Sequence, residues 1–138
     1  MNTELHLRIV GVLMVLLVAL NLYVPQRFNW KREMAALSLL NRQIFLVHAM
    51  FICVILLMFA GLTLLMPREL MQPTPLARAV LFALAAFWFL RLAAQWLVYD
   101  WRLWRGDRFN TAMHLLFTAV WLYLTATFTA ALWVNLRA

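Results

Sequence analysis

The chain has 138 residues, of which 67% are hydrophobic and only 12% are charged. This composition lies outside the range of soluble globular domains and is typical of chains that cross a membrane. The formal net charge of +7 does not indicate a nucleic-acid partner, because the basic residues flank apolar runs, where anionic lipid headgroups account for them. A chain of this length forms one domain at most. We therefore expect a single all-α transmembrane domain over residues 1–138.

Four apolar runs are long enough to cross a hydrocarbon core of about 30 Å as helices. They cover residues 8–24, 43–66, 76–99 and 111–135. We interpret the first run as a true span that ends at Pro25, because no small-residue cleavage site follows it. The single cysteine, Cys53, falls within the second run and is interpreted as a small apolar filler. The sequence thus predicts an integral membrane bundle of four antiparallel transmembrane helices.

Residues 26–42, QRFNWKREMAALSLLNR, differ from the spans because polar side chains recur along them. Arg27, Lys31, Ser38 and Arg42 fall roughly on one helical face, and apolar residues lean to the other. This pattern predicts an amphipathic helix that lies in the plane of the lipid headgroups. The alternative is that the segment extends the second span beyond the bilayer.

The distribution of basic residues predicts the orientation of the spans. The surface that carries residues 26–42 and the 100–108 loop holds Arg27, Lys31, Arg32, Arg42, Arg102, Arg105 and Arg108. The opposite surface holds Arg8, Arg68, Arg78 and Arg137. Because cytoplasmic loops carry the excess of Lys and Arg, we expect the first surface in the cytoplasm and both termini outside it, in a plasma or inner membrane.

The third span contains a polar face. Arg91, Gln95 and Tyr99 follow one another at intervals of four residues, so they lie on the same side of a helix. A charged side chain well inside a span costs about 2.5–3.5 kcal/mol and therefore indicates a function and a partner. Two histidines lie at a similar depth from the predicted cytoplasmic surface, His48 in the second span and His114 in the fourth. We expect these five residues to form a site in the cytoplasmic third of the bundle.

The first hypothesis for this site is electron transfer through haem b. Two neutral imidazoles that face each other across a helical bundle are what a six-coordinate b-type haem requires. His48 and His114 are the candidate iron ligands, and Arg91 with Arg42 or Arg105 would pair with the haem propionates. The same layout would suit a quinone headgroup.

Two other hypotheses use the same residues. In one, Arg91 and the histidines hold the phosphate or carboxylate of an anionic lipid between the helices, with an enzyme acting on a lipid as a variant in which a histidine is the general base. In the other, the polar residues only fix the bundle, and the chain is a small subunit whose helices contact lipid, a partner subunit or a second copy. Under that structural hypothesis His48 and Gln95 form hydrogen bonds between helices, and His114 lies at the membrane interface.

The fourth span carries a polar stripe at helical spacing, made of Thr111, His114, Thr118, Thr125 and Thr129. Threonines in spans usually donate to carbonyls of their own helix, so the stripe alone does not indicate a channel.

Some chemistries are poorly supported by the sequence. No carboxylate lies inside a span, because Glu33, Asp100 and Asp107 are all in flanks or loops. A carboxylate-bridged di-iron site or a membrane-embedded acid relay therefore lacks its ligands. Zinc would need His48, His114 and the interfacial Asp100 together, and nothing else in the sequence favours that set.

Overall fold

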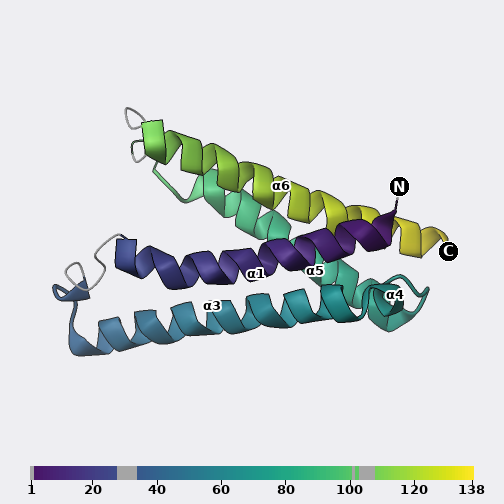
Figure 1. Cartoon of the computed structure of the whole chain (residues 1–138), viewed down its shortest axis with the longest axis horizontal. Helices are drawn as coiled ribbons and strands as arrows, with labels where there is room; N and C mark the ends of the chain where they lie inside the picture. The colour runs from purple at the N-terminus through teal and green to yellow at the C-terminus, as the bar shows by residue number, and fades with distance from the viewer. Residues whose placement is uncertain (1, 28–33, 101, 103–107) are drawn as a thin grey trace. The chain divides into compact units, whose positions relative to one another are not determined.

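The structure, a computed structural model, describes residues 2–27, 34–100, 102 and 108–138. In these ranges it contains helices and no strand. The helices are α1 (Thr3–Arg27), α3 (Leu39–Leu65), α4 (Pro67–Leu70), α5 (Pro75–Leu97) and α6 (Arg108–Arg137), as Figure 1 shows. Four of them, all but α4, are long and apolar enough to cross a membrane. The predicted all-α class with four long apolar helices is confirmed, and it fits a polytopic integral membrane protein.

Side-chain caps explain where two of the spans begin. The Ser38 hydroxyl accepts the backbone N–H of Asn41 at 3.3 Å and starts α3. The Thr74 hydroxyl accepts the N–H of Ala77 at 3.2 Å and starts α5. Such caps satisfy N–H groups that have no partner within the first helical turn. The helix α1 continues through Pro25 to Arg27, because a proline in the last turn removes only one backbone hydrogen bond. The part of α1 that is long and apolar enough to cross a membrane is Thr3–Tyr23, and the end of the first span at Pro25 stays a prediction.

The predicted amphipathic helix over 26–42 is interrupted in the structure. Residues 28–33 lie outside the described residues. Residues 35–37 form a turn, Ser38 caps α3, and 39–42 belong to the first turn of α3. The break follows from the Ser38 cap, because a capping residue leaves the helical backbone conformation. The last four residues of the segment belong to α3 and are continuous with the second span. That they extend this span beyond the bilayer stays a prediction. The position of the segment in the headgroup plane also stays a prediction.

The chain divides into two compact units. The first unit contains residues 1–7 and 68–138, and the second contains residues 8–67. The expectation of a single transmembrane domain stays a prediction. In the first unit α5 and α6 lie side by side (Figure 1). Both helices contribute almost fully buried apolar side chains to the core, among them Leu81, Leu84 and Trp88 of α5 and Leu124 and Phe128 of α6.

In the second unit, α1 and α3 approach closely at Gly11. A Cβ atom at this position would lie 2.6 Å from Cγ of Leu64 and 2.7 Å from Oγ1 of Thr63. Small residues at helix contacts let backbones come this near, and such contacts drive helix association within lipid. Arg8 adds one bond, from Nη1 to the Leu64 carbonyl at 3.2 Å. The contact between α1 and α3 therefore depends on the close approach of their backbones at Gly11.

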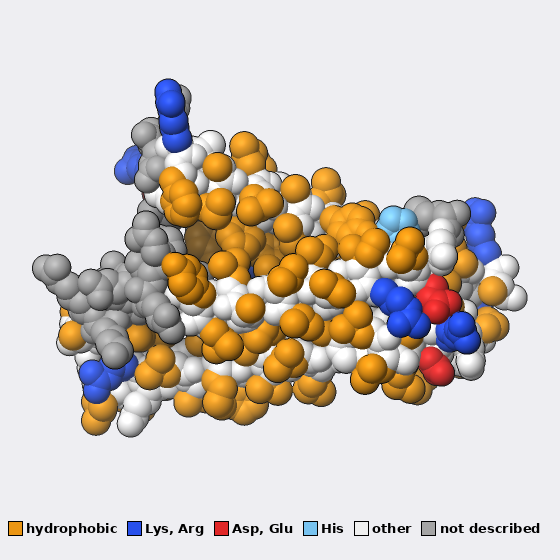
Figure 2. Space-filling model, viewed as in Figure 1, with side chains coloured by type: hydrophobic (Ala, Val, Ile, Leu, Met, Phe, Trp, Pro, Cys, Tyr) orange, Lys and Arg blue, Asp and Glu red, His pale blue; other side chains and the backbone are white. Residues whose placement is uncertain are grey.

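The helix surfaces are those of a lipid-facing protein. On the face drawn in Figure 2, hydrophobic side chains cover the helices along most of their length, and charged side chains gather near helix ends. Many of the exposed side chains are large and apolar, among them Leu65, Leu76 and Leu97. Apolar exposure on this scale is unfavourable in water and expected in a bilayer.

Candidate functional site

Five residues of the first unit form a polar and aromatic cluster between α5 and α6. Arg91 and Gln95 lie on α5, Tyr99 follows its end, and His114 and Trp121 lie on α6. We call this set the Arg91 cluster. Arg91 Nη1 donates to Gln95 Oε1 at 3.4 Å, and Gln95 Nε2 lies 2.9 Å from His114 Nδ1. The structure thus brings together Arg91, Gln95 and His114, which the sequence predicted as neighbours.

The guanidinium of Arg91 is held mainly by aromatic rings. Its Cζ atom lies 4.8 Å from the centre of the Trp121 ring and 5.8 Å from that of Tyr99. Cation–π contacts of this kind contribute about 0.5–2 kcal/mol, more where water is excluded. Trp121 is fixed in turn by stacking on Trp88 and Phe117, with ring centres 5.4 and 5.6 Å apart. Within the described ranges, Arg91 makes no ion pair with a carboxylate.

Hydrogen-bond polarity assigns the proton of His114. A guanidinium can only donate, so Arg91 faces the oxygen of the Gln95 amide, and the NH₂ group of that amide faces His114. An amide NH₂ also only donates, so Nδ1 of His114 accepts, and the proton of the neutral imidazole sits on Nε2. Gln95 and His114 are both buried, and the Trp96 ring meets His114 edge-on with centres 4.9 Å apart. The imidazole is therefore fixed in one orientation.

The remaining predicted site residues, His48 and Arg42, belong to α3 in the second unit. His48 is exposed, and its Nδ1 donates to the Ile44 carbonyl at 2.8 Å, which leaves the lone pair of the neutral ring on Nε2. Arg42 is exposed in the first turn of the helix. That His48 and His114 face each other stays a prediction, and Arg105 lies outside the described residues.

Metal ligands do not gather anywhere in the part of the chain that the structure describes, where no three His, Cys, Asp or Glu side chains form a group that could hold an ion. Asp100, the third residue of the weighed zinc set, accepts the backbone N–H of Arg102 at 2.9 Å.

Sequence reasoning missed a buried polar link at the far end of the same helix pair. Asn135 of α6 is fully buried; its Nδ2 donates to the carbonyls of Leu70 at 3.0 Å and Gln72 at 2.6 Å. Its Oδ1 accepts Nε of Arg78 at 3.1 Å, and its backbone carbonyl accepts Nη2 of Arg78 at 3.2 Å. In the sequence, the only indication of this link was an asparagine in the last turns of an apolar run. The link joins α6 to the end of α4, to α5 and to the turn between α4 and α5.

A second pair that sequence reasoning missed joins His6 and Tyr123. The His6 Nδ1 atom and the Tyr123 hydroxyl are 2.8 Å apart, and both residues are half-buried. Because 117 positions separate the two residues, no local pattern could have revealed the contact.

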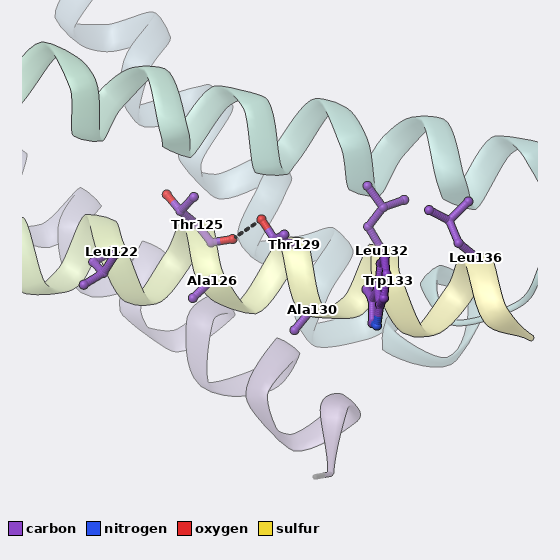
Figure 3. Close-up of a pocket in the computed structure, with 8 residues that line it drawn as sticks. All are labelled: Leu122, Thr125, Ala126, Thr129, Ala130, Leu132, Trp133 and Leu136. Carbon is purple, nitrogen blue, oxygen red and sulfur yellow. Dashed lines mark hydrogen bonds between the residues drawn. The ribbon is translucent and has the colours of Figure 1, made fainter.

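An apolar hollow of about 510 Å³ runs along α6, separate from the Arg91 cluster. Figure 3 shows its lining: Leu122, Thr125, Ala126, Thr129, Ala130, Leu132, Trp133 and Leu136. The threonine hydroxyls turn back to their own helix, Thr125 to the Trp121 carbonyl and Thr129 to that of Thr125, both at 2.8 Å. This confirms the expectation for span threonines. The hollow therefore presents apolar surface and little chemistry.

No protein-family model matches the chain, and neither does any curated protein or solved structure. The chemistry of the Arg91 cluster is therefore the basis for a function.

Proposed function

We propose that this membrane protein binds the anionic headgroup of an amphiphile, such as a lipid phosphate or a fatty carboxylate, at the Arg91 cluster. The observation that carries the proposal is that the positive charge of Arg91 has no carboxylate partner among the described residues. Arg91 is a permanent cation within an apolar helix. A cation that is partly removed from water gains free energy when an opposite charge pairs with it.

The donors around Arg91 fit an acceptor-rich group. A guanidinium has five N–H donors in a planar fork, which matches a phosphate or carboxylate bidentately. Only one of these donors is used by Gln95, at the long distance of 3.4 Å. The Trp121 and Tyr99 rings hold the cation without consuming its hydrogen bonds. Arg91 is half-buried, so an amphiphile can approach it from the helix surface.

The test compares lipid retention by matched arginine variants. The full chain is purified in mild detergent from membranes supplied with phosphatidic acid, and bound lipid is measured by native mass spectrometry. We expect Arg91→Leu to lower bound phosphatidic acid at least about tenfold, because charge-assisted hydrogen bonds contribute about 1.5–3 kcal/mol.

Arg137→Leu is the control, because Arg137 also lies over a tryptophan ring, 4.1 Å from the centre of Trp133, but at the exposed end of α6. Equal retention by wild type and Arg91→Leu would refute the proposal. In that case the structural hypothesis would lead, under which Arg91→Leu leaves the protein as stable as the wild type or more so.

A second candidate function, haem b or quinone binding, is favoured by His48. Imidazoles that bind metal usually donate their other N–H to a carbonyl or carboxylate. His48 has this arrangement, with Nδ1 on the Ile44 carbonyl and the Nε2 lone pair available by polarity. The resting form of His114 does not share it, since its Nδ1 accepts from Gln95.

The test of this second candidate is an absorption spectrum of the solubilised protein before and after dithionite. A Soret band that His48→Ala removes would support haem. A protein spectrum without visible bands, from cells supplied with haem, would count against it.

A further inference from the structure

We infer that the Arg91 cluster selects a phosphate monoester, such as the headgroup of phosphatidic acid, over a carboxylate or a phosphodiester, because the indole N–H of Trp121 donates a further hydrogen bond to the bound anion. The inference rests on the proposed function, since it needs an anion at Arg91. It narrows the ligand from an acidic amphiphile to one class of headgroup, and it makes Trp121 a residue that determines specificity.

Two buried indole N–H groups have no hydrogen-bond acceptor in the part of the chain that the structure describes. They are Nε1 of Trp88 and Nε1 of Trp121, and the two side chains are only 1% and 6% exposed. A buried tryptophan usually finds a partner for this donor, and native proteins keep few buried donors unpaired. An acceptor that reaches either group is therefore favourable.

The unpaired donor of Trp121 belongs to the ring that holds the cation. Cζ of Arg91 lies 4.8 Å from the centre of this ring. The ring is fixed by nearly parallel stacking on Trp88 and Phe117, at interplanar angles of 16° and 15°. Its N–H therefore keeps one direction, and an anion that binds the guanidinium is also a neighbour of the Trp121 ring.

Unused donors accumulate around Arg91. Only one of the five guanidinium donors has an acceptor among the described residues, the Gln95 oxygen at 3.4 Å. Trp121 and Trp88 each add an N–H that is not used. Guanidinium and indole groups can donate but not accept. The ligand that complements them is therefore an anion with several acceptor oxygens.

The number of terminal oxygens separates the candidate headgroups. A carboxylate that an arginine holds bidentately lies in the plane of the guanidinium, with both oxygens facing the fork. A phosphodiester also has only two terminal oxygens. A phosphate monoester has three, with a charge of about −1.5 to −2 at neutral pH, and its tetrahedral shape puts one oxygen outside the guanidinium plane. That oxygen can accept from the ring that lies against the cation.

The Trp121 N–H gains more from an anion than an exposed donor would. Folding has already removed it from water, so an acceptor that reaches it does not replace an existing hydrogen bond. A hydrogen bond to an oxyanion is stronger than one to a neutral group, and a water-poor interior strengthens it further. Arg91 is half-buried, so the headgroup can enter beside it from the helix surface.

The Trp121 donor can be observed directly by NMR. The full chain, with nitrogen-15 in its tryptophans, is placed in phosphatidylcholine nanodiscs alone, with phosphatidic acid, with oleate, or with inorganic phosphate in the buffer. Each of the seven tryptophans gives one indole N–H signal, and Trp121→Phe identifies that of Trp121 by its loss. We expect phosphatidic acid to move this signal downfield, as a new hydrogen bond to an oxyanion does, and oleate to leave it in place.

The inorganic phosphate sample distinguishes two sources of the same chemistry. A shift with inorganic phosphate as well would support recognition of the phosphate group by itself. A shift that requires phosphatidic acid would support recognition of the phosphate as part of a lipid.

Trp121→Phe also separates the N–H from the ring. The variant keeps an aromatic face against Arg91, and a weaker cation–π contact affects both ligands alike. The ratio of bound phosphatidic acid to bound oleate in native mass spectrometry therefore reports the N–H. We expect this ratio to fall about tenfold, since the lost bond is to a charged group. Trp133→Phe is the matched control beneath Arg137 and should leave the ratio unchanged. The remaining indole signals verify that each variant keeps its fold.

Three results would overturn the inference while the proposed function stands. The Trp121 signal could stay in place while Arg91-dependent binding of phosphatidic acid is seen, oleate could move it as far as phosphatidic acid does, or Trp121→Phe could keep the wild-type ratio. Binding of phosphatidic acid that is equal in wild type and Arg91→Leu would instead refute the proposed function, and this inference with it.

Discussion

The first unit adds buried polar links to the apolar core of its helices, whereas in the second unit α1 approaches α3 closely at a glycine. In the first unit Asn135 alone bonds to two carbonyls and a guanidinium. In the second, Gly11 leaves no room for a Cβ atom beside Thr63 and Leu64. Polar links fix register because a shifted helix would leave buried groups unpaired, but glycine contacts depend only on shape.

This difference explains where the candidate site can form. The Arg91 cluster needs side chains from two helices at defined distances, and the α5–α6 pair supplies the fixed register. In the second unit, the polar side chains His48 and Thr63 bond to carbonyls of their own helix. A polar side chain that bonds to its own helix costs little free energy within a membrane. It recognises no other group unless a ligand or partner binds to it.

The largest effect is expected from Asn135→Leu in the first unit. The substitution leaves two carbonyls and the Nε donor of Arg78 without their partner, while Arg78 Nη2 keeps its bond to the backbone carbonyl of residue 135. We expect a loss of about 2–4 kcal/mol in the free energy of unfolding. Titration with SDS in mixed micelles, followed by circular dichroism, measures it. Asn21→Leu is the matched control, because Asn21 is exposed and bonds only to the Leu17 carbonyl of its own helix at 2.8 Å. Equal losses in the two variants would remove the contrast between the units.

Gly11→Ala should have the next largest effect, in the second unit. The added methyl meets Leu64 and Thr63 at under 3 Å, and overpacking of this kind costs about 1–3 kcal/mol. Gly61→Ala on α3 is the control, since its Cβ would meet nothing within 4 Å and alanine is favoured in helices by about 1 kcal/mol. In the same titration, the free energy of unfolding should therefore fall for Gly11→Ala and rise for Gly61→Ala. A stabilised Gly11→Ala protein would show that the close approach is not required.

Tyr123→Phe tests a single polar link of the first unit. It removes the 2.8 Å contact with His6 and keeps the ring, so we expect about 0.5–1.5 kcal/mol of destabilisation. A double-mutant cycle with His6→Phe should give a coupling of similar size. Additive effects would mean that the two side chains do not interact.

Glu4→Gln should have the smallest effect. Glu4 pairs with Arg68 at 3.5 Å, but the Arg68 side chain is 81% exposed. Exposed ion pairs contribute between zero and about 1 kcal/mol and weaken with salt. We expect a change below about 0.5 kcal/mol in the same titration at physiological salt, and a larger one would place this pair among the structural links of the first unit.

The sequence was sufficient to predict the four spans because their apolar runs match the thickness of the hydrocarbon core. It also predicted that Arg91 and Gln95 share a face, because their spacing matches one helical turn. For His114, the sequence predicted only that it lies at a similar depth in the membrane as Arg91 and Gln95. Its contact with Gln95 depends on how α5 packs on α6, which the sequence does not reveal. The interval between Asn135 and Leu70 spans 65 positions, so a pattern within one helix could not contain that link. The interruption of the helix before Ser38 was not predicted, because the polar periodicity of residues 26–42 favoured one continuous helix and a single capping residue was the only sign against it.

The unequal lengths of α5 and α6 make the first unit sensitive to bilayer thickness. The 30 residues of α6 span about 45 Å, and the 23 residues of α5 about 35 Å, against a hydrocarbon core of about 30 Å. The longer helix must tilt or project beyond its neighbour, and each ångström of mismatch costs a fraction of a kcal/mol. Because α6 carries His114 and α5 carries Arg91, the same tilt sets the angle at which the two halves of the cluster meet. Thicker membranes should therefore relax α6, so lipid chain length can tune the site without any contact with it.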